Sequence, residues 1–174
     1  MTPRQKLAAK IGAGALALAV PLVVTFEGYV PWVHRDPIGR LAACYGHDDQ
    51  TMTPGKRFTD AECRAMLDQD LLKHAEALDC IKTPMTDGQK AAFLSFSFNV
   101  GNSAFCRSTL ARKANQGDMR GACAELLRWT RAGDKEFSQK QASFLKKYCQ
   151  RDPSQTPYWL GVKMIAAKIA SWSK

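Results

Sequence analysis

Glu27 and Asp36 are two carboxylic acids nine residues apart, in a segment rich in glycine, proline and aromatic residues. Glu27 ends an apolar run, and apolar surroundings favour the protonated form of a carboxyl group. Asp36 follows Arg35 in a polar turn sequence, which favours the ionised form. Such a pair can cleave a glycosidic bond, one acid donating a proton while the other activates water or stabilises positive charge. Acids at this spacing are also common on protein surfaces, so the spacing alone does not show that this pair is catalytic. The surrounding sequence has to be considered as well.

The elements that must position this pair are mainly helical. Apolar residues at helical spacing and capping patterns predict helices over residues 60–80, 87–100, 108–115, 118–131, 138–150 and 158–173. Residues 27–49 predict a turn followed by short strands. The expected fold class is therefore mainly α (α+β), with one small β patch and no domain boundary after residue 27.

The chain is strongly basic. Lysine and arginine outnumber aspartate and glutamate by 25 to 16, which gives a formal net charge of +9. This charge favours a polyanionic partner, which could be nucleic acid, anionic lipid or the bacterial cell wall. The sequence has no nucleic-acid recognition motif, and a nucleic-acid binder needs neither an apolar N-terminus nor six cysteines. We therefore expect no nucleic-acid partner.

Six cysteines form an even set along the chain: Cys44, Cys63, Cys80, Cys106, Cys123 and Cys149. None forms a C-x-x-C pair, and the histidines do not flank them as ligands, so we expect no metal and no cofactor. The alternatives are buried thiols in a cytoplasmic protein and disulfides in an exported one. The N-terminus favours disulfides, and pairing of sequence neighbours (44–63, 80–106, 123–149) is our working hypothesis.

The N-terminus has the pattern of an export segment. The first ten residues carry three basic side chains and no acid, and residues 11–26 carry no charge. The uncharged run has 16 residues, against about 17–25 for a comfortable membrane span. A cleaved signal peptide, a weak uncleaved anchor and a buried helix remain as alternatives. We expect a weak signal-anchor over residues 1–26, which places the exported protein at the inner membrane and, after release, in the periplasm.

Several motifs follow one another in a fixed order. They are Glu27-Gly28, Asp36, Gly39, Cys44-Tyr45-Gly46-His47, Thr53-Pro54-Gly55, Phe98-Asn99-Val100-Gly101, Arg107-Ser108-Thr109-Leu110, Asn115-Gln116-Gly117-Asp118 and Arg128-Trp129. Together they cover roughly residues 1–137, so the match is more specific than a single motif. On these residues the chain resembles the phage T4-type lysozyme family, in its lambdoid branch with signal-anchor-release N-termini.

The resemblance implies a two-lobed lysozyme-like fold, with a small β-sheet lobe and a helical lobe. It implies an endolysin that hydrolyses the β-1,4 bond between N-acetylmuramic acid and N-acetylglucosamine in peptidoglycan, which lyses the host. Glu27 is then the general acid and Asp36 positions the attacking water. The lysozyme domain is expected over 27–152, with 153–174 as an amphipathic helical extension packed on it, and the protein is expected to be a monomer.

Five further residues are candidates for substrate binding: Tyr45, His47, Phe98, Asn99 and Gly101. The last three are expected to shape the cleft and cap a helix rather than to do chemistry. A histidine at this kind of position is more often a hydrogen-bonded structural residue than a base.

The sequence departs from the family pattern at Ala42, where the family has a threonine six residues after the aspartate. A hydroxyl that orders the attacking water is worth about 10²-fold in rate if orientation is its main effect. Tyr45 or His47 could compensate. Two alternatives to hydrolysis therefore stay open: a lytic transglycosylase, which needs no water, and a catalytically impaired peptidoglycan-binding protein. A second departure is Ser138-Gln139-Lys140-Gln141-Ala142, where relatives carry a Gly-Leu and paired-arginine stretch.

We also expect anchoring to control activity. No linker separates the apolar run from Glu27. While that run lies in the membrane, Glu27 is held at the membrane face and cannot meet Asp36. Release of the anchor lets the two acids come together.

Overall fold

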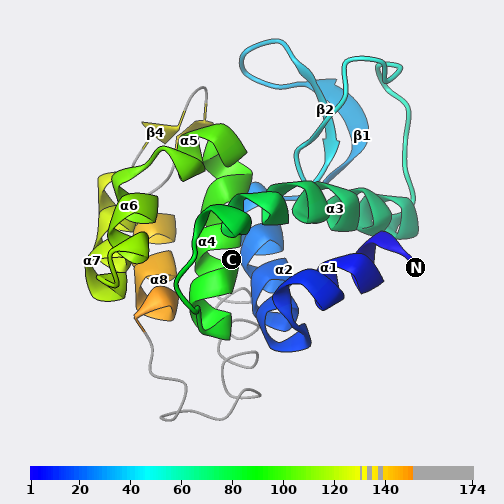
Figure 1. Ribbon diagram of the computed structural model, residues 1–174. Helices are drawn as coiled ribbons and strands as arrows, with labels where there is room; N and C mark the ends of the chain where they lie inside the picture. The colour runs from blue at the N-terminus through cyan, green and yellow to red at the C-terminus, as the bar shows by residue number, and fades with distance from the viewer. Residues whose placement is uncertain (130, 133–134, 137–138, 151–174) are drawn as a thin grey trace.

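The structure is a computed structural model that describes residues 1–129, 131–132, 135–136 and 139–150. A small antiparallel sheet projects from one side of a helical body (Figure 1). This arrangement confirms the expected mainly α fold with a β patch. The helix expected over 158–173 and the extension over 153–174 lie outside the described residues.

The chain begins with two helices, α1 (Pro3–Ile11) and α2 (Ala13–Glu27). Thr2 and Gln5 form a capping box at the start of α1, and a proline follows the cap, where its missing N–H costs nothing. Gly12 separates the helices with φ of 91°, a conformation that glycine adopts readily. The helices meet at a bend of 117°, so the N-terminal segment is not one straight rod.

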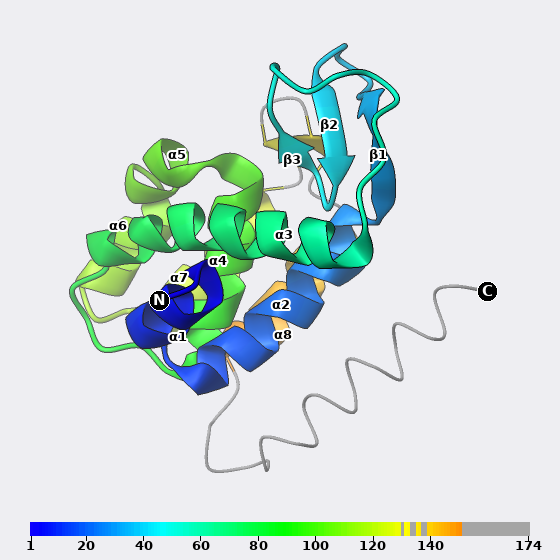
Figure 2. The ribbon, with the colours of Figure 1, turned by 90° about the vertical axis from the view of Figure 1, so that its right-hand side faces the viewer.

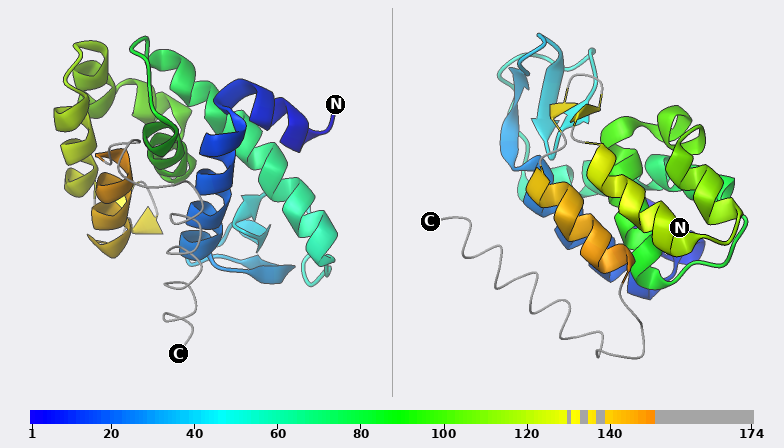
Figure 3. Two further views of the ribbon diagram at one scale, coloured as in Figure 1. Left: turned by 90° about the horizontal axis from the view of Figure 1, so that it is seen from below. Right: turned by 90° about the vertical axis from the view of Figure 1, so that its left-hand side faces the viewer.

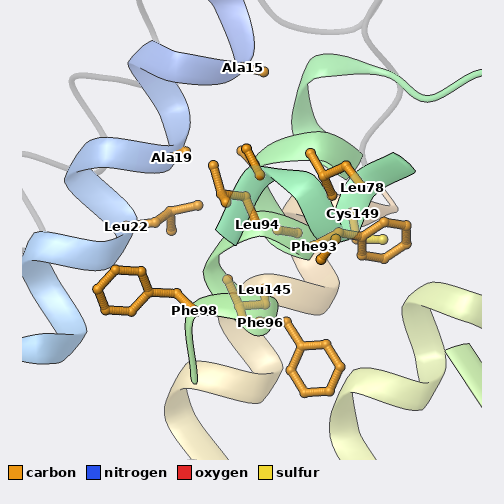
Figure 4. Packing of buried hydrophobic residues seen from close by; sticks show 14 of the residues in the cluster. Ala15, Ala19, Leu22, Leu78, Phe93, Leu94, Phe96, Phe98, Leu145 and Cys149 are labelled. Carbon is orange, nitrogen blue, oxygen red and sulfur yellow. The ribbon is translucent and has the colours of Figure 1, made fainter. Parts of the chain in front are cut away.

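Helix α2 lies in the hydrophobic core. Six of its side chains are buried: Ala15, Leu16, Leu18, Ala19, Leu22 and Val23. They pack against α4 (Asp87–Val100), in which residues 91–98 are all buried. Figure 4 shows Ala19 and Leu22 facing the side chains of α4 across this contact. Because the core fixes α2 over most of its length, it also fixes the position of Glu27 at its C-terminal end.

The sheet has three strands in the order β1-β2-β3: β1 (Val30–Arg35), β2 (Leu41–Cys44) and β3 (His47–Asp48). Val33 and Ala43 belong to a small second core under the sheet. His34 pairs with Ala42, and Ala42 pairs in turn with Asp48. Residues that face each other in an antiparallel pair share one side of the sheet, so these three lie on the face away from the small core.

Helix α3 (Asp60–Ala75) joins the sheet to the helical body (Figure 2). It starts at the capping box expected from Thr59 and Glu62. The predicted helix over 60–80 is confirmed as an α-helix as far as Ala75, and a 3₁₀ turn, η1 (Glu76–Cys80), completes it. The tighter last turn is a common way for a helix to satisfy its final carbonyl groups.

The remaining elements are α5 (Asn102–Cys106), α6 (Thr109–Asn115), α7 (Met119–Glu125), η2 (Leu126–Arg128), β4 (Arg131–Ala132), β5 (Lys135–Glu136) and α8 (Gln139–Cys149). The helix expected over 118–131 is shorter than predicted, because α7 ends at Glu125 and a two-stranded ribbon, β4-β5, follows η2. Helix α8 packs against α4 and lies on the same side of the molecule as α7 (Figure 3).

Three disulfides join the six cysteines as sequence neighbours, as the working hypothesis predicted. Cys44–Cys63 connects β2 to α3, with its Cα atoms 5.1 Å apart. Cys80–Cys106 and Cys123–Cys149 lie within the helical body. The first disulfide therefore ties the sheet to the helix beneath it, and the other two link helical segments to each other.

Candidate active site

Glu27 is the last residue of α2, and its side chain is half-buried. The next residue, Gly28, has φ of 74°, which lets the chain leave the helix and enter β1 two residues later. The helix that carries Glu27 is anchored in the main core, and the strand after it belongs to the sheet. Glu27 therefore lies at the junction of the helical body and the sheet.

Asp36 follows the last residue of β1 and begins the turn to β2. Its Oδ1 atom accepts hydrogen bonds from the backbone N–H groups of Ile38, at 3.0 Å, and Arg40, at 2.8 Å. Its own N–H donates to the carbonyl of Arg40, at 2.8 Å, which continues the ladder between the strands. These bonds fix the orientation of the carboxylate. Both side-chain bonds use Oδ1, so Oδ2 is the oxygen open to a water molecule or a substrate.

One short strand therefore has a candidate acid before it and a candidate base after it. Glu27 precedes β1 by three residues, and Asp36 follows it directly. Ala42 lies on the neighbouring strand, opposite His34, and offers no hydrogen-bonding side chain. The sequence named Glu27, Asp36 and Ala42 as candidate positions, and it did not single out His34. Its only sequence signal is the two-residue spacing from Asp36, which in a strand puts both side chains on the same face.

Tyr45 and His47 were expected near the substrate, but the structure gives both of them partners within the protein. The Tyr45 ring packs against Tyr29, with centroids 5.1 Å apart. The Tyr29 hydroxyl donates to Asp60, and this hydrogen bond is the main cause that raises the pKa of Tyr29 to about 12.

His47 contacts Asp70 of α3, with 2.8 Å between Nδ1 and Oδ2. The hydrogen bond to Asp70 raises the pKa of His47, and it outweighs burial, which acts in the opposite direction. The pair connects β3 to α3, and both of its side chains are partly buried. The bond to Asp70 holds the His47 ring in place between β3 and α3.

Phe98, Asn99 and Gly101 lie at the C-terminal end of α4. Phe98 is buried, and its ring lies 5.0 Å from that of His74. Gly101 has φ of 83° and ends the helix by donating its N–H to the carbonyl of Ser97. Asn99 differs from both, because its Oδ1 atom is buried and has no hydrogen-bond partner among the described residues. An unsatisfied buried acceptor is uncommon, which makes Asn99 a candidate for hydrogen bonding to a ligand.

The described residues contain no group of three or more histidine, cysteine or acidic side chains that could hold a metal ion. The candidate side chains are two carboxylates, imidazoles and an amide. They can transfer protons, order water and accept hydrogen bonds from a neutral polar ligand. This chemistry suits acid–base cleavage of a polar polymer.

Comparison with known proteins shows the family and the fold of this chain. The model of the phage lysozyme family matches residues 24–144. The SAR-endolysin of bacteriophage PS119 is 40% identical over 141 residues, which cover 77% of this chain and 84% of the relative. Among solved structures, the muramidase domain of SpmX from Asticaccaulis excentricus has a TM-score of 0.68 and 29% identity, over 77% of this chain and 95% of that one.

A mutant form of P22 lysozyme shares the fold with a TM-score of 0.67 at 23% identity, over 76% of this chain and 95% of that one. The family match begins three residues before Glu27, and it includes the whole sheet and most of the described helical body. The matched region thus contains both candidate carboxylates and the strand that joins them. The chain therefore belongs to the phage lysozyme family, in its SAR-endolysin branch, and is an endolysin of the lysozyme type.

Proposed function

We propose that this endolysin hydrolyses the β-1,4 bond between N-acetylmuramic acid and N-acetylglucosamine in peptidoglycan, with Glu27 as general acid and Asp36 as the residue that positions the attacking water. The observation that carries the proposal is the placement of the two acids around β1. Glu27 ends a helix fixed in the core, and Asp36 is oriented by two backbone N–H groups. Both positions are rigid, as an acid–base pair requires.

In the proposed reaction, protonated Glu27 gives its proton to the glycosidic oxygen while the bond from that oxygen to the anomeric carbon breaks. A water molecule bonds to the anomeric carbon and gives a proton to the Asp36 carboxylate. One glycan fragment leaves with a new hydroxyl group and the other with a reducing end. Proton exchange with solvent then returns Glu27 to its acid form and Asp36 to its carboxylate form.

We further assign substrate binding to Asn99. Both sugars of peptidoglycan carry an N-acetyl group, whose N–H is a hydrogen-bond donor. The buried Oδ1 of Asn99, which has no hydrogen-bond partner among the described residues, can accept such a bond. Binding the glycan then removes the cost of an unsatisfied buried acceptor.

Two isosteric substitutions test the catalytic roles. Glu27→Gln and Asp36→Asn keep size and shape but remove the proton donor and the base. Each is expected to lower the rate of peptidoglycan clearing by at least 10²-fold, the usual contribution of one acid–base group. Purified protein is assayed on cell walls, with circular dichroism as the control for folding. Clearing at the wild-type rate by folded Glu27→Gln contradicts the proposal.

We also propose that α1 and α2 are a releasable anchor, which holds the exported protein at the inner membrane before it acts in the periplasm. No single helix in the part of the chain that the structure describes is long and apolar enough to cross a bilayer. The bent pair α1 and α2 together passes that test by length and composition. In the structure the apolar side chains of α2 pack in the core, so a segment that leaves lipid remains shielded from water.

Residues of α2 outside the core allow anchoring to be tested without damage to the fold. Ala13 is exposed and Ala17 is half-buried. The double variant Ala13→Leu/Ala17→Leu makes the segment more apolar, and Ala13→Gln/Ala17→Gln is a control of similar size and opposite polarity. We expect the leucine variant to stay in the membrane fraction and to delay lysis, and the glutamine variant to be released early. Identical fractionation and lysis times for the two variants contradict the proposed anchor.

A further inference from the structure

We propose that His34 positions the attacking water together with Asp36, a role that rests on the proposed lysozyme function. Hydrolysis needs a water molecule held in one orientation, and one carboxylate oxygen alone leaves that water free to rotate. Oδ1 of Asp36 is occupied by two backbone N–H groups, which leaves Oδ2 for the water. A second polar group near Oδ2 is therefore required.

The strand register places His34 where that group is needed. His34 lies directly opposite Ala42, so their Cβ atoms are about 4.5–5.5 Å apart on one face of the sheet. Asp36 lies two residues further along, and its N–H bond to Arg40 continues the same ladder. Because side chains alternate along a strand, His34 and Asp36 point to the same face. Ala42 contributes only a methyl group, so it offers no hydrogen bond that would compete with the imidazole for the water.

The hydrogen bonding of His34 fixes which ring nitrogen is available. Nδ1 lies 3.2 Å from the carbonyl oxygen of Trp32. A carbonyl oxygen can only accept, so Nδ1 is the donor and carries the proton in this contact. In the neutral ring, Nε2 is then an acceptor with a free lone pair. One proton of the water can point to Nε2 and the other to Oδ2 of Asp36, which aims the oxygen lone pair at the anomeric carbon.

The other polar side chains near this face already have partners. His47 is bonded to Asp70, and the Tyr45 ring packs against Tyr29. Asp48, which lies opposite Ala42 on the third strand, forms an ion pair with Arg40 at 2.5 Å. Gln50 bonds to the backbone of Leu41 through both ends of its amide group. The hydrogen bond that His34 forms among the described residues uses Nδ1, so its Nε2 acceptor is available to a water molecule.

In the proposed reaction the imidazole acts only as a hydrogen-bond acceptor for the water. The water forms its bond to the anomeric carbon, the glycosidic bond breaks, and the released proton goes to Asp36. His34 takes up no proton and only holds the second O–H of the water. Its loss is therefore expected to lower kcat and to leave KM nearly unchanged, because the glycan itself does not need this contact to bind.

A double-mutant cycle between positions 34 and 42 tests this role. His34→Phe keeps a ring of similar size but has no acceptor, and we expect kcat to fall by about 10²-fold. Ala42→Thr adds a hydroxyl group directly across from position 34. In the His34→Phe background this hydroxyl can hold the water, so we expect it to restore kcat by about tenfold or more. In the wild-type background the same substitution should change kcat less than threefold. The reason is that the effects of two neighbouring groups that hold the same water molecule do not add.

Thermal melting of the four proteins controls for folding, and Glu27→Gln separates the two hypotheses. If Glu27→Gln is inactive while folded His34→Phe keeps kcat within threefold of wild type, the role of His34 is wrong and the lysozyme mechanism stands. If Ala42→Thr raises kcat equally in both backgrounds, the two side chains do not share a task and the inference is likewise overturned. If Glu27→Gln is fully active, the proposed function itself is wrong.

Discussion

The pair His47 and Asp70 shows how a single contact can hold the site in shape. It joins β3 to α3 by a 2.8 Å hydrogen bond between partly buried side chains. The pKa of His47 is raised, chiefly by this bond, so the folded protein binds a proton more tightly than the unfolded chain does. The charged pair therefore stabilises the fold fully below the unfolded pKa of about 6.5. This stabilisation is lost as the pH rises through the folded pKa.

Asp70→Asn should accordingly destabilise the protein in a pH-dependent way. A hydrogen bond to a charged group contributes roughly 1.5–3 kcal/mol, and we expect a loss of that size at about pH 5.5. At about pH 9 the loss should be clearly smaller, because His47 is neutral there. The measurement is the free energy of unfolding by urea at both pH values, with His47→Asn as the second corner of a cycle. A loss of equal size at the two pH values contradicts this account.

Sequence alone could propose Glu27 and Asp36 from their residue types and spacing, and the resemblance to the lysozyme family pointed to them and to the missing hydroxyl at Ala42. It could not identify His34, since that requires the register of β1 against β2, which the turn after Asp36 sets. The same holds for His47, whose partner lies 23 residues away on a helix. It stays a candidate substrate contact, and its bond to Asp70 is a feature that the sequence could not show.

At the scale of elements, the close approach of α4 and α8 is set by a glycine. A Cβ atom added at Gly88 would lie 2.6 Å from the backbone carbonyl oxygen of Tyr148. Backbone cannot move aside as a side-chain end can, so the two helices would have to separate. The C-terminal end of α8 is also tied to α7 by the Cys123–Cys149 disulfide, which limits how far it can move.

Gly88→Ala is therefore expected to destabilise the fold, although alanine is the better helix former by about 1 kcal/mol. Overpacking costs about 1–3 kcal/mol, and each kcal/mol lowers Tm by about 2–4 °C in a chain of this size. Calorimetry should thus show a Tm a few degrees lower. An unchanged or higher Tm for Gly88→Ala means that α4 and α8 are not in this close contact.

Helix starts were the most predictable elements, because Thr59 and Thr86 each form the capping box that their sequence indicates. The β4-β5 ribbon was missed. The sequence Gly133-Asp134 between its strands is a turn signal, but the apolar spacing over 118–131 favoured a helix there. The bend at Gly12 was also missed, since one glycine in an alanine-rich run does not show whether the helix breaks.

For the whole molecule, the sheet and the helical body are held by different disulfides. Cys44–Cys63 fixes β2 on α3, two residues after Ala42, whereas Cys80–Cys106 joins the end of η1 to the end of α5. Their separations of 19 and 26 residues are similar, so chain entropy predicts stabilisation that differs by only about 0.3 kcal/mol. The two disulfides are therefore expected to stabilise the protein by similar amounts, but they hold different segments in place.

Replacing each pair by serines should separate stability from activity. Both double variants are expected to lose about 2–4 kcal/mol of stability. At a low temperature where both remain folded, the variant without Cys44–Cys63 should also lose several-fold in kcat, because Ala42 and His34 depend on the position of β2. The variant without Cys80–Cys106 should keep its kcat. Equal kcat in the two variants contradicts the view that this disulfide supports the site.

The central claim is that the whole molecule uses Glu27 to drive hydrolysis of peptidoglycan. The most direct test is mass spectrometry of the products formed from purified peptidoglycan by the wild-type protein and by Glu27→Gln. We predict fragments with ordinary reducing ends from the wild type and none from the variant. Anhydro-ended fragments would contradict hydrolysis and indicate a transglycosylase, and an absence of products from both proteins would indicate a peptidoglycan-binding protein without this activity.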